Sequence, residues 1–583
     1  MLHTLTRSLR ENKGPALVTV LLSALEVVFE IVIPLFMSNL IDFGIEGGSM
    51  AAVWKFGAFL LLLAAFQLAT GVLAARIAAR ASVGFAANLR EDMYDNVQTF
   101  AFSNIDKFST ASIVTRLTTD TTNVQNAFQM LMRMAIRAPV MLIFSMIVSF
   151  RISRDISMTF LIILPILALA LFFIIRSVFP VFSRVFRTYD ELNNVVQENV
   201  RGIRVVKSFN QERHEIGKFG AISERIYQDF SKGERLITLN APLMQFCIYT
   251  CMIVISWLGA KAIIASGNDP ALGLTTGNLT ALITYTMQIL SSLMMLSMVF
   301  AMLTISLSSA RRIAEVLEER SDIPQPEQPV MTVRNGAVDF DHVSFVYASK
   351  ADKKVLDDID LHIRSGETIG IIGGTGASKS SLVQLIPRLY DVTCGKLTLG
   401  GVDVRDYDLD TLRGAVAMVL QKNELFSGTI AENLRWGNEN ATDEQLRHAC
   451  KLACADEFIS AMPDGYDTHI EQGGTNVSGG QKQRLCIARA LLKKPKVLIL
   501  DDSTSAVDTR TDAQIQQALS TYIPDTTKII IAQRISSVQN ADRIVVLDDG
   551  HIDAVGCHDE LLRTCEIYRE VYESQQKGGE DDA

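Results

Sequence analysis

The sequence predicts a two-part protein, in which a bundle of six transmembrane helices with long cytoplasmic extensions precedes a soluble α/β domain. The chain has 583 residues, more than one hydrophobic core can organise, so at least two domains are expected. Hydrophobic residues make up 48% of the chain and are unevenly spread, as in a protein with a membrane half and a soluble half. In the second half, apolar strands run into glycine-rich or acidic segments, the arrangement of an α/β sheet.

The net charge and the N-terminal residues further limit the classes of protein to which this chain can belong. The formal net charge is −9 and no basic tract dominates, so nucleic acid is not an expected partner. Residues 1–12 place leucines at helical spacing between polar residues, which predicts either a short helix on the membrane surface or a solvated leader. No small-residue cleavage site follows and further apolar spans do, so we expect this segment to lead into a first membrane helix.

Six stretches of roughly 20 or more mostly apolar residues are long enough to cross a bilayer. They lie near residues 15–42, 52–78, 129–150, 156–180, 242–266 and 278–306. The connections after the first and fifth spans are short and contain no Lys or Arg, whereas those after the second and fourth are long and rich in both. The positive-inside bias therefore places the long connections, both termini and the second domain in the cytoplasm of a multi-pass plasma-membrane protein. The short Arg151–Arg154 link opposes this orientation, but the alternation of the other loops outweighs it.

The long cytoplasmic connections keep helical periodicity and contain few Gly or Pro residues. The spans are therefore expected to continue as helices beyond the bilayer. Their turning points are predicted near Asn104–Ser112 and Val206–Arg213.

Two pairs of charged residues stand out within the predicted spans. Glu26 and Glu30 share one face of the first span, and Arg133 and Arg137 share one face of the third. Counting the helical rise places both pairs near the middle of the membrane, where charge is costly. Two interpretations stay open: the residues lie in or beside a translocation cavity, pairing or contacting substrate, or they form a purely structural ion pair.

The change between the two halves falls near residue 320. The chain is charged and helical through Glu319, and then becomes a linker that contains Pro324 and Pro326. The predicted domains are 1–320 and 321–583.

A glycine-rich loop follows the predicted strand Thr368–Ile372. Its residues are Gly373, Gly374, Thr375, Gly376, Ala377, Ser378, Lys379, Ser380 and Ser381. In the phosphate-loop pattern G-x-x-x-x-G-K-[ST], backbone N–H groups surround the nucleotide phosphates, the lysine offsets their charge and a hydroxyl holds Mg²⁺. Lys379 and Ser380 fit the last two roles, whereas Ser378 stands where glycine is expected and its side chain could crowd the backbone. An α/β P-loop nucleotide-binding domain that still binds ATP is the prediction.

A second phosphate-binding segment lies about 100 residues later in the chain. Ser478, Gly479, Gly480 and Gln481 open a predicted helix, whose free N–H groups and dipole favour a phosphate. The apolar strand Val497–Leu500 then ends in Asp501 and Asp502. An aspartate at the carboxyl end of a buried strand is where such sheets place Mg²⁺ beside nucleotide phosphates.

The order of six spans, phosphate loop, SGGQ segment and strand with acid resembles the half-transporters of ATP-binding-cassette (ABC) exporters. The resemblance implies that Tyr347 stacks on adenine and that Gln421 touches Mg²⁺ and the attacking water. For these two residues, a surface tyrosine and an ordinary loop amide are the alternatives. It also implies that Ser478–Gln481 caps the γ-phosphate of ATP held by a partner subunit, next to a D-loop at Ser505–Asp508. The segment Glu198–Glu212 resembles a coupling region of that family.

Three positions depart from the family pattern. Active members carry glutamate where this chain has Asp502, and a switch histidine where it has Gln533. Hydrolysis depends on positioning, and a misplacement of about 1 Å can lose about 100-fold in rate. The family's usual glutamate before the signature is Gln472, which is expected to alter contact with the coupling helices. Asp502 or Gln533 alone would be compatible with neutral drift. Together with Ser378, these two departures predict a site that binds ATP but hydrolyses it poorly.

The resemblance is strongest to the degenerate-site subunit of bacterial heterodimeric multidrug exporters. It implies ATP-driven export of amphipathic small molecules, with ATP and Mg²⁺ as cofactors and a second, non-identical half-transporter as partner. The intact signature of this chain would then complete the active site of that partner. Export of peptide, lipid or siderophore, and a membrane regulatory ATPase that transports nothing, are the alternatives.

Overall fold

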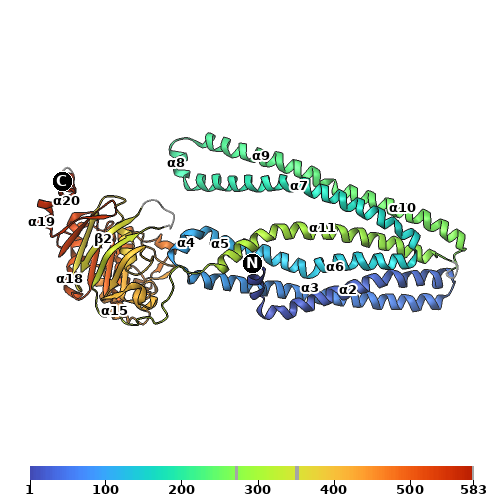
Figure 1. Ribbon diagram of the computed structural model, residues 1–583, viewed down its shortest axis with the longest axis horizontal. Helices are drawn as coiled ribbons and strands as arrows, with labels where there is room; N and C mark the ends of the chain where they lie inside the picture. The colour runs from blue at the N-terminus through green and yellow to red at the C-terminus, as the bar shows by residue number, and fades with distance from the viewer. Residues whose placement is uncertain (270–272, 348–353, 581–583) are drawn as a thin grey trace. The chain divides into compact units, whose positions relative to one another are not determined.

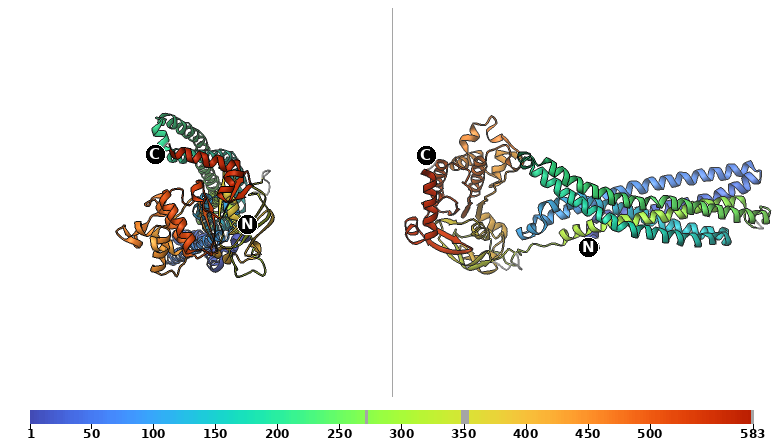
Figure 2. Two further views of the ribbon diagram at one scale, coloured as in Figure 1. Left: turned by 90° about the vertical axis from the view of Figure 1, so that its left-hand side faces the viewer. Right: turned by 90° about the horizontal axis from the view of Figure 1, so that it is seen from above.

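The computed structural model describes residues 1–269, 273–347 and 354–580. The chain divides into two compact units, coloured along the chain in Figures 1 and 2. The first unit comprises Met1–Gln98 and Thr110–Glu319, and the second comprises Thr99–Ser109 and Arg320–Ala583. A short segment from the N-terminal half therefore groups with the C-terminal unit.

The first unit is built entirely of helices, most of them very long (Figure 1). They are α1 (Leu2–Arg7), α2 (Lys13–Asn39), α3 (Met50–Gln98), α5 (Thr110–Thr115), α6 (Thr121–Ile152), α7 (Arg154–Arg201), α8 (Ile203–Ser208), α9 (Glu212–Thr238), α10 (Asn240–Ser266) and α11 (Thr276–Glu318). Within the described residues, six helical segments are long and apolar enough to cross a membrane. Each contains one of the six predicted spans, so this part of the prediction is confirmed.

The N-terminal leader forms the short helix α1, and its contacts are with the bundle. Leu5 is buried, and the hydroxyl of Ser8 donates to Asp92 of α3 over 2.5 Å. The side-chain amide of Asn88 donates to the carbonyl of Ser8 over 3.0 Å. The leader is therefore packed on α3 and is not a solvated tail.

Helices α7 and α9 run side by side, and the short helix α8 makes the turn between them (Figure 1). Ion pairs connect the two helices: Arg225 donates to Glu191 over 2.7 Å, and Lys218 donates to Glu198 over 3.2 Å. The second predicted turning point thus lies where the structure places α8. The first one is the short helix α4 (Phe102–Phe108).

Helix α4 belongs to the second unit and packs on it through specific contacts. The hydroxyl of Tyr390 donates to Asp106 over 2.9 Å, and the side-chain amide of Asn104 donates to the carbonyl of Arg320 over 3.0 Å. The ring of Phe102 lies 6.1 Å from that of Tyr390. A turn between two membrane-type helices is therefore an integral part of the C-terminal unit.

The second unit contains two main sheets. The antiparallel sheet has the order β2-β1-β4-β5, and the larger sheet has the order β12-β11-β3-β10-β9-β6. The strands are β1 (Val338–Phe345), β2 (Leu356–Ile363), β3 (Thr368–Gly373), β4 (Cys394–Leu399), β5 (Val402–Asp403), β6 (Val416–Val419), β9 (Val497–Asp501), β10 (Thr527–Ile531), β11 (Arg543–Asp548) and β12 (His551–Gly556), with a small pair β7 (Gly428–Thr429) and β8 (His469–Ile470).

The larger sheet is parallel from β11 to β6 and is buried on both faces. Along β9 the side chains alternate between two apolar cores: Leu498 and Leu500 enter one, and Val497 and Ile499 enter the other. Strands covered on both faces read as continuous apolar runs, which is why the sequence shows this strand so clearly. Because the strands are parallel, the carboxyl ends of β3, β6, β9 and β10 meet at one edge of the sheet.

Besides α4, the second unit contains nine helices that the structure describes. They are α12 (Lys379–Leu385), α13 (Leu409–Ala415), α14 (Ile430–Arg435), α15 (Asp443–Leu452), α16 (Asp456–Ser460), α17 (Gly479–Leu492), α18 (Thr509–Tyr522), α19 (His558–Thr564) and α20 (Glu566–Glu580). A membrane helical bundle joined to an α/β domain is thus the observed fold class, as predicted.

Candidate functional site

The predicted phosphate loop connects β3 to α12. The ammonium group of Lys379 donates to the carbonyls of Gly373 and Gly374 over 2.7 and 2.8 Å, so it lies across the loop. Burial lowers the pKa of Lys379, and the nearby carboxylates Asp501 and Asp502 oppose that shift. Gly376 has a φ of +89° and open space where a side chain would stand. The loop therefore has the exposed backbone and the cation that a phosphate needs.

Ser378 adopts a left-handed backbone conformation, with φ of +66° and ψ of +22°. This geometry explains why the phosphate-loop pattern has glycine here, since a side chain in this region costs about 1–2 kcal/mol. Serine in place of the expected glycine therefore strains the backbone at the start of α12.

Asp501 ends β9 and its side chain is buried. Burial raises the pKa of Asp501, while a hydrogen bond from Ser380 and the charge of Lys379 act in the opposite direction. A buried carboxylate beside a hydroxyl offers the hard oxygen ligands that Mg²⁺ prefers. These residues therefore fit a magnesium ion next to the phosphate loop.

Asp502 is held by amides from two other strand ends. Its Oδ2 accepts a hydrogen bond from Gln533 Nε2 over 2.6 Å and a longer one from Gln421 Nε2 over 3.5 Å. Burial raises the pKa of Asp502, which these two hydrogen bonds oppose. Gln421 follows β6, Asp502 follows β9 and Gln533 follows β10, so the parallel sheet brings together three residues far apart in sequence.

Tyr347 contacts α12 through its hydroxyl, and the residue is 45% exposed. Its hydroxyl is 2.8 Å from the hydroxyl of Ser381, and the edge-on rings of Phe345 and Tyr390 lie 4.8 and 5.1 Å away. Ser381 is buried and pairs with this tyrosine. An exposed aromatic ring thus stands next to the phosphate loop.

The SGGQ segment forms the start of α17. The hydroxyl of Ser478 accepts from the N–H of Gln481 over 3.3 Å, and the Gln481 side chain accepts from the N–H of Ser478 over 2.9 Å. This reciprocal cap orders the helix N-terminus, while Ser478 and Gly479 stay exposed. At Gly480 a Cβ would lie 2.9 Å from the carbonyl oxygen of Ala506, so only glycine fits without a shift.

Gln483 is a residue of this region that the sequence analysis missed. It is 5% exposed, accepts from the N–H of Ala506 over 3.0 Å and donates to the hydroxyl of Ser505 over 3.3 Å. It thereby ties the signature helix to the segment Ser505–Asp508. The sequence carries no local signal for this role, because α17 also contains Gln481, Lys482 and Arg484.

Gln472 lies on an exposed turn. The next residue, Gly473, has φ of +72°, and its carbonyl accepts from the ammonium of Lys482 over 2.7 Å. The turn is therefore attached to α17, and the Gln472 side chain is free to meet other surfaces.

Three of the four charged residues singled out in the spans form one cluster. Arg137 of α6 donates to Glu26 and to Glu30 of α2, each over 2.7 Å. Arg137 lies about 22 Å along α6 from Ile152, well inside a hydrocarbon layer of about 30 Å. Arg133 is half-buried and has no carboxylate or hydrogen-bond partner among the described residues. Glu26, Glu30 and Arg137 therefore form an ion triad, and Arg133 stands apart from it.

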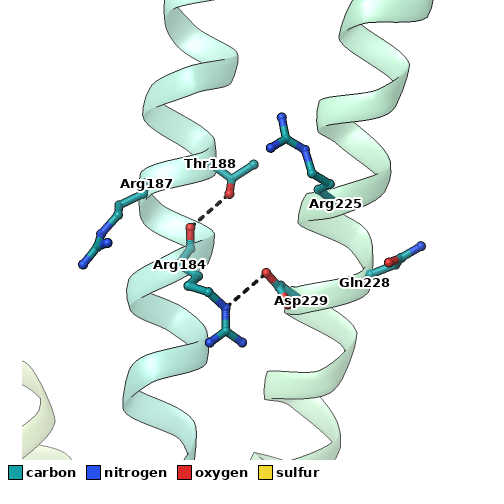
Figure 3. Close-up of a pocket in the computed structure, with 6 residues that line it drawn as sticks. All are labelled: Arg184, Arg187, Thr188, Arg225, Gln228 and Asp229. Atoms are coloured by element: carbon teal, nitrogen blue, oxygen red, sulfur yellow. Dashed lines mark hydrogen bonds and ion pairs between the residues drawn. The ribbon is translucent and has the colours of Figure 1, made fainter.

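A pocket between α7 and α9 is drawn in Figure 3. It is lined by Arg184, Arg187, Thr188, Arg225, Gln228 and Asp229. Arg184 pairs with Asp229 over 3.5 Å, Arg225 pairs with Glu191, and Arg187 points away from α9 (Figure 3). The pocket therefore has little charge left for a ligand.

Six apolar helices and a phosphate loop beside paired carboxylates define a membrane protein driven by a nucleotide. Comparison with protein families matches residues 16–294 to the ABC transporter transmembrane region and residues 356–505 to the ABC transporter model. The chain is 35% identical over 558 residues to the uncharacterized ABC transporter ATP-binding protein YfiB of Bacillus subtilis, covering 96% of each chain. It is 33% identical over 580 residues to the uncharacterized protein Rv1273c of Mycobacterium tuberculosis, covering 99% of this chain and 98% of that one.

The protein belongs to the ABC transporter family, as a half-transporter of the bacterial exporter type. A solved structure of a bacterial Atm1-family ABC exporter with ATP bound superposes with a TM-score of 0.82 at 23% identity, covering 97% of this chain and 99% of that one, and confirms the fold. The chain is a multi-pass membrane protein whose second domain binds ATP and couples its hydrolysis to transport.

Replacing Ser378 with Gly should stabilise the second domain. The change relieves about 1–2 kcal/mol of left-handed strain but costs about 0.4–1 kcal/mol through greater entropy of the unfolded chain, which leaves a net gain of up to about 1.6 kcal/mol. The measurement is the apparent Tm of the purified protein by scanning fluorimetry. Gly376→Ser, which places a side chain at a second positive φ, should lower the same Tm, and a lower Tm for Ser378→Gly would contradict the strain.

Replacing Arg137 with Ala should destabilise the membrane unit by roughly 3–5 kcal/mol, because two carboxylates then remain unpaired in the span. Thermal unfolding in lipid nanodiscs measures the loss. The triple variant Arg137→Ala, Glu26→Gln, Glu30→Gln removes the charges together and should regain most of the stability. Equal Tm values for the wild type and Arg137→Ala would contradict the ion triad.

Proposed function

We propose that this chain is the hydrolysis-impaired subunit of a heterodimeric ABC exporter that moves amphipathic small molecules out of the bacterial cell. The observation that carries the proposal is the setting of Asp502, whose carboxylate accepts hydrogen bonds from Gln533 and Gln421. In the family pattern, the residue at this place is a glutamate that orients or deprotonates the attacking water.

The two amides support slow hydrolysis for a chemical reason. A side-chain amide donates and accepts hydrogen bonds, but it takes up no proton near neutral pH. Gln533 therefore stabilises the γ-phosphate without carrying the charge that a switch histidine supplies. The carboxylate of Asp502 is one methylene shorter than that of glutamate, and in-line attack tolerates little displacement. Strain at Ser378 adds a third departure in the same site.

The remaining groups support retention of MgATP. Lys379 would offset the phosphate charge, and Ser380, Gln421 and Asp501 would hold Mg²⁺, which neutralises charge that develops on the phosphates. The exposed ring of Tyr347 would stack on the base. We infer that this site holds ATP longer than a competent site does.

The signature segment supports a division of labour between two subunits. Ser478 and Gly479 are ordered by the helix cap and yet exposed. They are therefore suited to cap the γ-phosphate of ATP on a second chain. Two copies of this chain would make two poor sites, whereas a partner with glutamate and histidine would make one efficient site with this signature.

The substrate class and the orientation are further parts of the proposal. The positive-inside bias places both termini and the nucleotide domain in the cytoplasm. Peptide, lipid or siderophore export would use the same architecture, and substrate assays separate these possibilities. A regulatory ATPase would show no ATP-dependent uptake of amphipathic dyes into inverted vesicles, and such uptake would exclude it.

A tagged copy of this chain, purified in mild detergent from its native membrane, should bring down a second half-transporter. Mass spectrometry identifies that partner, and its sequence should carry glutamate after the Mg²⁺ aspartate and a switch histidine. Recovery of this chain alone would show a homodimer and contradict the proposed pairing.

The double change Asp502→Glu and Gln533→His should raise ATP turnover of the assembled complex, because it restores a longer carboxylate and a titratable switch. Turnover is measured as phosphate release in nanodiscs. The matched control combines Asp502→Glu with Gln539→His, which places histidine at an exposed glutamine outside the site. Turnover equal to that of the wild type in both double variants would show that the impairment does not lie in this pair, and turnover raised equally in both would assign it to Asp502 alone.

A further inference from the structure

Gln575 of α20 makes a two-point contact with the loop that carries Gln533. Its side-chain nitrogen donates to the carbonyl oxygen of Gln533 over 2.8 Å. Its side-chain oxygen accepts from the N–H of Ile535 over 2.9 Å. One amide from the C-terminal helix thus bridges the backbone on both sides of Arg534.

The position of Gln575 does not depend on this contact, because α20 is anchored independently. Tyr568 at the start of the helix is fully buried in the core that also contains Leu500 and Ile530. Its hydroxyl lies 2.7 Å from the Nδ1 of His558. Gln575 follows Tyr568 by about two helical turns and so lies on the same face of α20. The buried tyrosine therefore aims the amide at the loop.

Burial secures only part of the loop that carries Gln533. Ile535 and Val538 are 1% exposed, so their side chains secure the later part of the loop in the core. Gln533 and Arg534 are exposed, and burial does not secure them. The bond from Gln575 to the Gln533 carbonyl fixes the backbone at the residue whose side chain reaches Asp502.

We infer that Gln575 is a positioning residue for the nucleotide site of this chain. It orders the backbone of Gln533, and Gln533 in turn holds Asp502 beside the phosphates. The C-terminal helix thereby slows the loss of ATP from this site. The inference rests on the proposed function, in which this site retains its nucleotide.

Hydrogen exchange on the purified full-length complex, followed by mass spectrometry, tests the contact without any need for hydrolysis. In Gln575→Ala, the amide of Ile535 loses its acceptor and should exchange roughly tenfold faster. Gln575→Glu keeps an acceptor for Ile535 but has no donor for Gln533, so protection at Ile535 should stay near that of the wild type. The matched control is Gln576→Ala, since the neighbouring Gln576 bonds Tyr572 on α20 itself and should leave the loop unchanged.

Release of labelled ATP from this chain's site tests the role. Gln575→Ala and Gln575→Glu should both release ATP several-fold faster than the wild type and Gln576→Ala, because both lose the bond to the Gln533 carbonyl. If Gln575 served only to hold the N–H of Ile535, Gln575→Glu would release ATP at the wild-type rate. That result would overturn the inference. Unchanged exchange at Ile535 in Gln575→Ala would overturn it as well. Fast release already in the wild type would instead contradict the proposed function, while the exchange comparison would still report on the contact.

Discussion

The burial of β9 between two apolar cores is the constraint on which the nucleotide domain depends. A strand covered on both faces ends abruptly where its first charged residues appear, and here those residues are Asp501 and Asp502. Neighbouring parallel strands end at the same edge, so their loops bring Lys379, Gln421 and Gln533 to the two acids. The chemistry of the site follows from this edge, because each group is held by a different strand of one rigid sheet.

In the membrane unit, the main constraint is the cost of placing charged side chains in hydrocarbon. Glu26 and Glu30 would be costly in hydrocarbon, and Arg137 satisfies both at 2.7 Å. This geometry supports the pairing interpretation for Arg137 and separates it from Arg133, which has no carboxylate partner among the described residues. The contacts of α4 show a second link: a turn between two long helices is packed on the C-terminal unit through Tyr390. The turn that follows α3 is thus part of the unit that binds ATP.

Much of the fold could be read from the sequence because its signals are local. The apolar runs predicted all six membrane helices, and β3 and β9 lie within one residue of the predicted strands Thr368–Ile372 and Val497–Leu500. The phosphate loop and the signature are contiguous motifs, so their residues could be named in advance. Gln483 and Gln575 could not be found in this way, since a glutamine on a helix carries no sign of the backbone it will contact. The motif showed only that Ser378 replaces an expected glycine. The structure adds that this residue has a left-handed backbone conformation, which strains a side chain.

The sequence by itself determined the two-part architecture, the six spans, the phosphate loop, the signature and the departures at Asp502 and Gln533. These depend on composition, periodicity and short motifs, which act within a few residues of one another. The tertiary structure decided which side chains meet: that two amides hold Asp502, that Arg137 takes both glutamates, and that α20 reaches the loop of Gln533. Those contacts join residues far apart in sequence, and only the packing of strands and helices around a common core brings such residues within hydrogen-bonding distance.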